Sequence, residues 1–494
     1  MVWLRPITVS LWTLVCCLAA TAVANPSAQQ IARSLRQRLS SGSEVYVLSQ
    51  GNYTAEITQR WNAFEPPTYV IAVKPRLETD VQYAQRNCVP FMATGGGHGY
   101  TTTTSQLDNG IDIDLGFFNS VNVDAANNLM TIGGSVRFSQ VFDPLYNVGK
   151  EIATGSCSCV GMVGATLGGG IGPLQGVRGL IIDALVSVRI VTGTGEIVTA
   201  SKTQNSDLFW GIRGAGANFG IVTSATYRVS DQTNGGNVVI MDVSFAAEKN
   251  ASVFNLLDSL VRNGQPGEFS IGFGAVWDPN AGAPVISLSS FYFGPESAAA
   301  AYNQPFLDLG PTVQRVQTVP WNKLISTMRF GGDTQACIKG RLQSVYGSNL
   351  YSFDPANFQR TFADMSDFFA ANPNLRNSMF VAELFPPANT VTVPDGETAY
   401  PFRNTTAYSL FQFALPDPSY QPTVDAFAVP ARRAYAAGGG NPNVEVYVNY
   451  AHGDEGVNAW YSPRKLGRLR GLKNRWDPHN LFSFTNGINP PRRN

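Results

Sequence analysis

Charged residues are scarce in this chain of 494 residues. They make up 14% of it, with 35 Lys and Arg against 35 Asp and Glu, whereas a soluble domain usually has about 25%. The balanced charge gives no general attraction to nucleic acid, to an anionic membrane or to an acidic substrate, so we expect a small-molecule partner. Hydrophobic residues reach 44%, which excludes disorder for most of the chain, and the length suggests two or three domains.

Histidines and the motifs of several large enzyme classes are also rare or missing. Only three histidines occur and no H-E-x-x-H is present, which argues against a zinc enzyme, so we expect no metal. The chain has no G-x-S-x-G elbow, and Gly149-Lys150 is followed by Glu151, so neither an α/β-hydrolase nor a P-loop is indicated. The GAGANFG run at 214–220 is one residue away from the dinucleotide fingerprint and leads into a strand-like segment instead of a helix.

Long apolar runs are absent except near the start. Arg5 precedes the run VSLWTLVCCLAATAV, and Ala22-Val23-Ala24 follows the small-residue pattern of a signal-peptidase site. The alternative, a membrane anchor, needs about 20 apolar residues, more than this run supplies. We therefore expect residues 1–24 to be a signal peptide and the protein to be secreted. The sequons at Asn52, Asn250 and Asn404 then become candidate glycosylation sites.

Cysteines are too few for a disulfide scaffold. Four of the six remain after cleavage, at positions 88, 157, 159 and 337. The ordinary interpretation in a secreted protein is two disulfides. Because Cys157 and Cys159 are too close in sequence to bridge easily, one of them is available for another role, and the pairing of Cys88, Cys159 and Cys337 stays open.

The hydrophobic pattern divides the chain into segments and predicts an α+β fold. Residues 25–62 begin with a helix, IARSLRQRL; from 63 to 233 strand-like runs such as YVIAVKP alternate with short helices such as LETDVQYAQRN. From 234 to 439, runs such as FSIGFGAVW and AYSLFQFAL alternate with period two and are separated by helical segments. This indicates an antiparallel sheet covered by helices. Residues 440–494 complete the first domain.

Two glycine clusters carry the chemical signal. ATGGGHGY at 93–100 lies between a strand and a polar loop, and ATGSCSCVGMVGATLGGGIG covers 153–172. Successive glycines leave backbone N–H groups open to a pyrophosphate. The alternative for either cluster is an ordinary tight turn.

These segments resemble the berberine-bridge-enzyme-like oxidoreductases of the vanillyl-alcohol-oxidase superfamily, fungal type. The resemblance covers nearly the whole mature chain and rests on four anchors in order: GGGHG, GSCSCVG with LGGGIG, DLFWGIRGAGANFGIVTSATYRV, and VEVYVNY followed by RLRGLKNRWDPHNLFSF. It implies a PCMH-type FAD-binding domain with an inserted substrate domain. The DPHN motif at 477–480 reads as a structural turn.

The resemblance implies FAD held covalently. His98 matches the histidine that bonds to the flavin 8α carbon, and Cys157 matches the cysteine that bonds to C6 in the bicovalent members. This chain has S-C-V-G where the plant-like pattern has P-T-V-G, so Cys159 offers a competing thiol. The other cofactor-binding residues implied are Gly95, Gly96, Gly97, Gly99, Gly161, Gly169, Gly170, Gly220 and Ile221.

Catalysis is expected at the VEVYVNY segment. Read as a strand, it places Tyr447 on one face and Tyr450 on the other, and either is a candidate base if a cation or hydrogen bond lowers its pKa. Purely structural tyrosines are the alternative. Gln412 matches loosely a substrate-domain position that holds an acid or an amide in relatives.

The expected function is that of a secreted, monomeric FAD-linked oxidase that passes hydride from a small organic secondary metabolite to flavin and then electrons to dioxygen, giving hydrogen peroxide. Oxidation of a carbohydrate hydroxyl, or a catalytically inert glycan-binding protein, are the alternatives. The sequence does not fix the substrate.

Export is directly testable. We expect the mature protein to begin after Ala24 and to carry glycan on one or more of Asn52, Asn250 and Asn404. N-terminal sequencing and glycosidase-sensitive mass shifts of the protein secreted by a eukaryotic host measure both. An intracellular, unglycosylated chain that retains Met1 contradicts this prediction.

Overall fold

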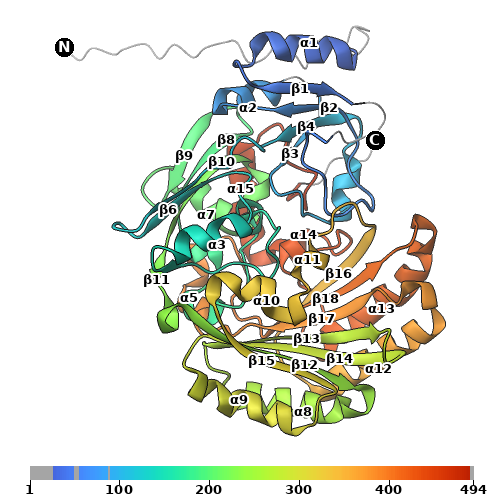
Figure 1. The fold of residues 1–494 in the computed structure, drawn as a ribbon. Coiled ribbons are helices and arrows are strands. Elements are labelled where there is room, and N and C mark those ends of the chain that lie inside the picture. Colours follow the sequence, from blue (N-terminus) through green and yellow to red (C-terminus); the bar gives the residue numbers. More distant parts are fainter. Residues whose placement is uncertain (1–25, 49–54, 87–88, 490–494) are drawn as a thin grey trace.

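The computed structural model describes residues 26–48, 55–86 and 89–489. Figure 1 shows two smaller sheets in the upper part of the molecule and one large sheet with its helices in the lower part. The expected signal segment, Asn52 and Cys88 lie outside the described residues. Within these ranges no helix is both long and apolar enough to span a bilayer.

The first sheet is small and mostly buried on both faces. Its strand order is β1-β2-β4-β3, with β2 and β3 each parallel to β4. The run Ile71, Ala72 and Val73 is fully buried, which explains why β2 is apolar without alternation. The elements are α1 (Ala28–Arg38), β1 (Glu44–Val47), β2 (Tyr69–Lys74), α2 (Glu78–Ala84), β3 (Phe91–Thr94) and β4 (Gly110–Asp114).

The second sheet is antiparallel, with strand order β5-β6-β10-β8-β9. Its strands are β5 (Val121–Asp124), β6 (Leu129–Gly133), β8 (Leu185–Thr192), β9 (Ile197–Ser201) and β10 (Gly220–Arg228), and a two-residue pair joins β7 (Lys150–Glu151) to β11 (Ser230–Asp231). The helices of this part are α3 (Ser139–Tyr146), α4 (Met162–Leu167), α5 (Gln175–Arg178), α6 (Ile181–Ala184) and α7 (Ser206–Ala215). The 214–220 run leads into β10, as expected.

The third sheet has seven antiparallel strands in the order β15-β12-β14-β13-β17-β18-β16. The longer helices cover one face of this sheet, as the alternating pattern predicted (Figure 1). Phenylalanines such as Phe254, Phe273 and Phe358 pack between these helices and the sheet. The strands are β12 (Asn237–Ala246), β13 (Phe269–Asp278), β14 (Ala283–Tyr292), β15 (Val313–Pro320), β16 (Gln343–Leu350), β17 (Met379–Leu384) and β18 (Ala407–Ala414). The helices of this half are α8 (Asn250–Arg262), α9 (Glu296–Asp308), α10 (Leu324–Gly331), α11 (Asp333–Ala336), α12 (Pro355–Ala371) and α13 (Gln421–Gly438).

Two expected sequons fall within this half. Asn250, the first residue of α8, is half-buried, and Asn404 is exposed.

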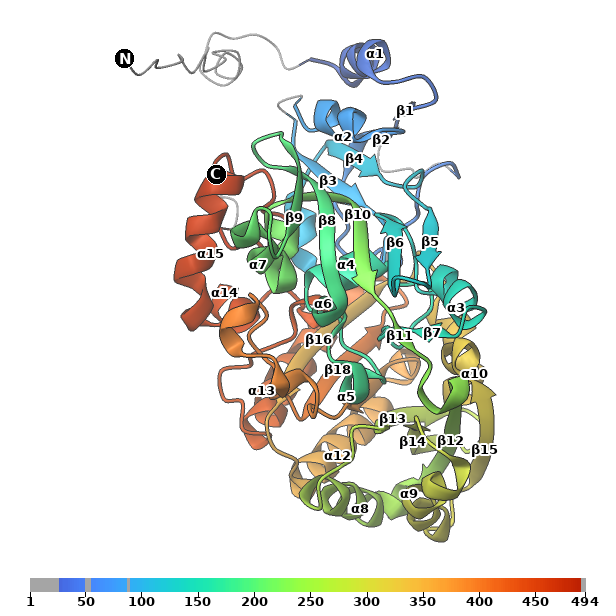
Figure 2. The same cartoon turned by 90° about the vertical axis from the view of Figure 1, so that its left-hand side faces the viewer.

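The C-terminal segment returns to the first half of the chain. Helix α14 (Val457–Tyr461) leads into α15 (Pro463–Trp476), and α15 lies beside α7 in Figure 2. The buried Lys473 ammonium donates to the Asp477 carboxylate at 2.7 Å, to the Asn218 carbonyl at 2.9 Å and to the Phe482 carbonyl at 2.6 Å. Asp477 also accepts the backbone N–H of Leu481 and of Phe482, both at 2.9 Å, so the D-P-x-N motif is the structural turn expected.

The VEVYVNY segment is not a strand, which corrects the sequence-based expectation. Val444 has φ 54° and residues Val448–Tyr450 form a 3-10 turn. The segment's backbone groups bond locally or to single partners: Tyr450 N–H donates to the Tyr447 carbonyl at 2.7 Å, and Tyr447 N–H donates to the Asn349 side chain at 3.0 Å. Without a strand, alternation does not decide which way the two tyrosines point.

The Lys473–Asp477 ion pair generates a stability prediction. Lys473→Met removes the ammonium and leaves Asp477 buried without its cation, so the free energy of unfolding should fall by about 3–5 kcal/mol. The midpoint of urea unfolding measures it. Arg470→Met, at an exposed position of the same helix, is the matched control and should change stability by less than about 0.5 kcal/mol. Equal midpoints for the two variants would contradict a stabilising role for the pair.

Candidate active site

The two glycine clusters meet in space. The loop after β3 and the turn before α4 touch backbone to backbone: a Cβ on Gly96 would lie 2.5 Å from the Gly161 nitrogen, and a Cβ on Gly161 would lie 2.8 Å from the Gly96 nitrogen. Gly97 has φ +72°, a region that favours glycine. Glycine at these positions is therefore required by close approach and by backbone conformation.

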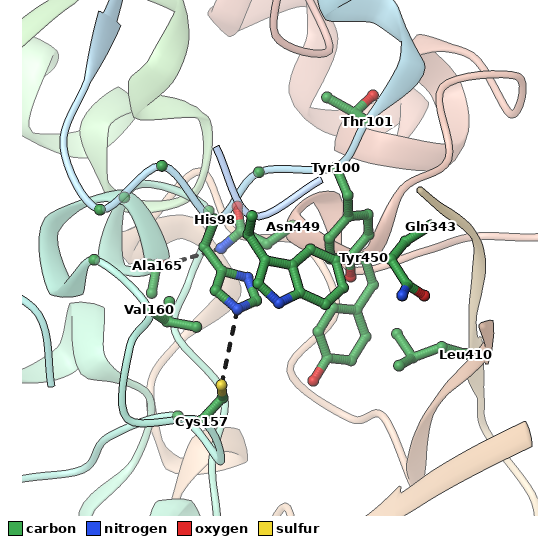
Figure 3. A pocket seen from close by; sticks show the side chains of 18 of the residues that line it. His98, Tyr100, Thr101, Cys157, Val160, Ala165, Gln343, Leu410, Asn449 and Tyr450 are labelled. Carbon is green, nitrogen blue, oxygen red and sulfur yellow. Dashed lines mark hydrogen bonds between the residues drawn. The ribbon is translucent and has the colours of Figure 1, made fainter. Parts of the chain in front are cut away.

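This contact brings His98 and Cys157 together. The His98 ring stacks on Trp61 with a centroid separation of 4.5 Å and an interplanar angle of 15°. Its Nε2 lies 3.8 Å from the Cys157 sulfur, and Figure 3 shows the two side chains pointing toward each other. Burial lowers the pKa of His98 to about 4, helped by the positive charges of Lys339 and Arg137. The imidazole is therefore neutral at physiological pH.

Cys157 lies beside a disulfide. Cys159 and Cys337 are bonded, which joins the second glycine cluster to the end of α11, and Cys157 is the free cysteine of the described chain. Burial raises the pKa of the Cys157 thiol to about 11, and the negative charge of Asp333 adds to the effect. Cys157 thus stays protonated in this structure.

A cavity of about 1290 Å³ opens around these two residues. It extends from Thr94 and Ile221, between β3 and β10, past the GGGHG loop to Met379 and Gln412 on the large sheet. A pocket for one drug-sized ligand measures about 300–1,000 Å³, so this cavity has room for a dinucleotide and a second molecule.

The wall of the cavity fits a polar cofactor such as FAD. Two wall residues have buried polar atoms without a hydrogen-bond partner in the described chain, Nε of Arg60 and the hydroxyl of Tyr100. Such atoms are costly to bury unless a ligand satisfies them. The sequence-predicted residues that line the cavity are Gly95, Gly96, Gly97, His98, Gly99, Cys157, Gly161, Gly220, Ile221, Gln412, Tyr447 and Tyr450.

Gly169 and Gly170 do not line the cavity. A Cβ on Gly169 would lie 2.7 Å from the Tyr400 ring, and one on Gly170 would lie 2.5 Å from Ile181. These two glycines have positive φ, +133° and +77°, and they shape the turn behind the cavity wall.

Tyr450 and the Glu383 carboxylate form a polar pair in the wall of the cavity. The Tyr450 hydroxyl donates to Glu383 Oε2 at 2.7 Å, and the Ser156 hydroxyl donates to Glu383 Oε1 at 2.8 Å. Burial raises the pKa of Glu383, against the two hydrogen bonds and the positive charge of Arg329. Burial and the charge of Glu383 raise the pKa of Tyr450 well above its ordinary value. In this pair the pKa of the Glu383 carboxyl is therefore raised, and the Tyr450 phenol is neutral.

Tyr447 has a different environment. Its hydroxyl accepts from the Gly170 N–H at 3.1 Å and from the Asn449 amide at 2.7 Å. Burial raises its pKa above the ordinary value. These contacts tie Tyr447 to the turn behind the cavity. In neither tyrosine is the pKa lowered, as a phenolate base would need.

The large sheet supplies the rest of the wall. Gln412 donates to the Gln343 side chain at 3.1 Å, and Tyr100, Tyr450, Gln343 and Leu410 lie together on one side of His98 (Figure 3). The surrounding side chains are mixed in character: Val276, Met379, Val381, Leu410 and Leu342 are aliphatic, whereas Ser287, Ser289 and Asn377 are polar.

Sequence reasoning missed Glu383, Trp61 and Tyr100. A lone acid in the apolar strand MFVAEL was a usable signal for Glu383, since an unpaired carboxylate is rarely buried. No local pattern singled out Trp61. The two histidines without an assigned role are structural or exposed: His452 stacks on Tyr346, and His479 is exposed.

Family models match two parts of the chain. Residues 73–201 match the model described as FAD binding domain, and residues 446–489 match the one described as berberine and berberine like. The first match includes both glycine clusters, and the second runs from Val446 past the end of α15.

Known proteins resemble nearly the whole chain. The FAD-linked oxidoreductase azaL of Aspergillus niger is 38% identical over 468 residues, which covers 93% of this chain and 99% of azaL. The FAD-linked oxidoreductase OXR1 of Pyricularia oryzae is 40% identical over 440 residues, 87% of this chain and 86% of OXR1.

Two solved structures share the fold. Physcomitrella patens BBE-like 1 superposes with a TM-score of 0.80 at 23% identity, over 95% of this chain and all of that chain. A glucooligosaccharide oxidase from Acremonium strictum, described as having a 6-S-cysteinyl, 8α-N1-histidyl FAD, superposes with a TM-score of 0.75 at 20% identity, over 90% and 98%. Because these relatives match most of its length, this chain belongs to the berberine-bridge-enzyme-like family of FAD-linked oxidoreductases.

Proposed function

We propose that this FAD-linked oxidoreductase is a secreted oxidase that removes hydride from a hydroxyl-bearing, largely apolar secondary metabolite and uses dioxygen as electron acceptor, releasing hydrogen peroxide. The observation that carries the proposal is the Tyr450–Glu383 pair, which faces the same cavity as His98 and Cys157. A base and a cofactor anchor thus share one cavity.

His98 and Cys157 are the residues that would hold the cofactor. FAD supplies the hydride acceptor and passes electrons to dioxygen when bound. A neutral imidazole and a thiol 3.8 Å apart suit two covalent links at one edge of a flavin ring. The solved glucooligosaccharide oxidase, with its cysteinyl and histidyl FAD, supports this assignment.

Tyr450 and Glu383 act together as the base. The Tyr450 oxygen takes the proton of the substrate hydroxyl while its own proton moves to Glu383 Oε2 along the 2.7 Å hydrogen bond. The raised pKa of Glu383 matches the carboxylate to this task, because a general base works best when its pKa approaches the operating pH. The hydrogen bond from Ser156 orients the carboxylate.

The wall of the large sheet favours an apolar substrate. Aliphatic side chains such as Val276, Met379 and Leu410 line much of it. The Gln343–Gln412 amide pair and the serines Ser287 and Ser289 lie among them. Such a surface suits a mostly carbon skeleton that carries one or two polar groups. A carbohydrate oxidase is the second candidate, because the glucooligosaccharide oxidase shares the fold. An inert glycan-binding protein is the third.

Anaerobic mixing of the purified protein with candidate substrates separates these functions. Bleaching of the flavin by a hydroxylated apolar metabolite, followed by peroxide release on admission of oxygen, supports the proposal. Bleaching by oligosaccharides alone favours the second candidate. No bleaching by either panel, with glycan binding retained, favours the third.

Removing the phenol should slow proton transfer. In Tyr450→Phe we expect flavin attachment to persist and the rate of flavin reduction to fall by about 10²–10⁴-fold, the scale of general-base catalysis. Stopped-flow absorbance measures that rate. Tyr46→Phe is the matched control, since the Tyr46 hydroxyl also donates to a glutamate, Glu44, at 2.7 Å on β1 outside the cavity. Parent rates in Tyr450→Phe would exclude this tyrosine from the proton path.

The pH profile tests the carboxylate. Glu383 must be ionised to receive the proton, so the reduction rate should fall as pH drops through its raised pKa. Glu383→Gln should be slow at every pH and should lack this acid limb. An unchanged acid limb in Glu383→Gln would assign it to another group.

A further inference from the structure

Three sulfur atoms gather at the edge of the cavity. The Cys157 sulfur lies 3.5 Å from that of Cys159 and 3.7 Å from that of Cys337, while the last two are bonded to each other. These distances are short enough for Cys157 and Cys337 to form a disulfide after a small movement, and for Cys157 and Cys159 to do so only with strain in the single residue between them. The chain nevertheless pairs two of them and leaves free the one that faces His98.

The free sulfur lies beside the disulfide and not at its end. In thiol–disulfide exchange the attacking sulfur approaches along the S–S axis. Its distances to the two bonded sulfurs then differ by one bond length, about 2 Å. Here they are nearly equal, 3.5 and 3.7 Å. The observed arrangement therefore does not favour thiol–disulfide exchange, and Cys157 keeps its thiol.

Other contacts hold the paired arrangement. The Ser158 backbone N–H donates to Asp333 Oδ1 at 3.0 Å, which ties the loop between the two cysteines to α11. The Trp61 indole N–H donates to the Ala336 carbonyl at 2.7 Å. The same indole stacks on His98, so one short helix and its disulfide are connected to both candidate flavin anchors.

We propose that Cys159 and Cys337 are positioning residues for flavin attachment: their disulfide withdraws the two thiols that would otherwise pair with Cys157, and keeps Cys157 free for the cofactor. The proposal rests on the proposed covalent FAD. Forming the disulfide removes one proton from each thiol and passes two electrons to a disulfide oxidant such as glutathione disulfide, which leaves as two thiols.

A single substitution and its rescue test this role. Cys159→Ser leaves Cys157 and Cys337 as the nearest thiols, so in glutathione disulfide we expect a Cys157–Cys337 bond and loss of the cysteinyl flavin, with the His98 link retained. Cys159→Ser/Cys337→Ser removes both rivals and should restore the cysteinyl link. Peptide mass spectrometry without reduction, after alkylation of free thiols, measures each species.

Each outcome decides the proposal. Cysteinyl flavin retained in the single variant, or not restored in the double variant, overturns it. Flavin on His98 reports that each variant has folded, and Cys337→Ser, which leaves Cys159 as the rival, serves if Cys159→Ser does not fold. If the parent protein lacks a cysteinyl flavin, the second link of the proposed function is wrong. The role in flavin attachment is then wrong as well, and the thiol map tests only the rivalry among the thiols: a Cys157–Cys337 peptide in the single variant supports that rivalry, and a free Cys157 refutes it.

Discussion

The contact between Gly96 and Gly161 is the constraint on which the site depends. Each glycine occupies space where a Cβ would meet the other loop's backbone within 3 Å. One loop follows strand β3 and the other precedes helix α4. Their single contact places His98, two positions after Gly96, opposite Cys157, four positions before Gly161. The stacking of Trp61 then holds the His98 ring, and the Cys159–Cys337 disulfide ties the loop that carries Cys157 to the end of α11.

The cavity divides its chemistry between two halves of the chain. The first half contributes the two glycine-rich loops, whose backbone N–H groups are accessible to a ligand. It also contributes His98 and Cys157, the two candidates for covalent attachment of the flavin. The large sheet contributes aliphatic side chains together with the Gln343–Gln412 amide pair and two serines, Ser287 and Ser289, and the C-terminal segment adds Tyr450. Glu383 connects the two halves, because it accepts from Ser156 in the glycine-rich loop and from Tyr450 in the C-terminal segment. The candidate base therefore forms only when all three parts are folded together.

Local sequence patterns predicted much of the fold but not the contacts that create the base. Alternation identified β13 and β18, helical runs identified α1 and α2, and the glycine clusters located the cavity wall. The same alternation failed at 444–450, where a positive φ at Val444 and single hydrogen bonds to other segments replace strand pairing. The Glu383–Tyr450 bond and the Cys159–Cys337 disulfide join residues 67 and 178 positions apart. No periodicity of one segment encodes such pairs.

The central claim is that His98 and Cys157 together hold the flavin in this cavity. Proteolysis of acid-precipitated protein, followed by mass spectrometry of the flavin-bearing peptides, tests it most directly. The account predicts flavin joined to one peptide containing His98 and to another containing Cys157. Flavin released in full by acid, or attached to neither residue, would contradict it.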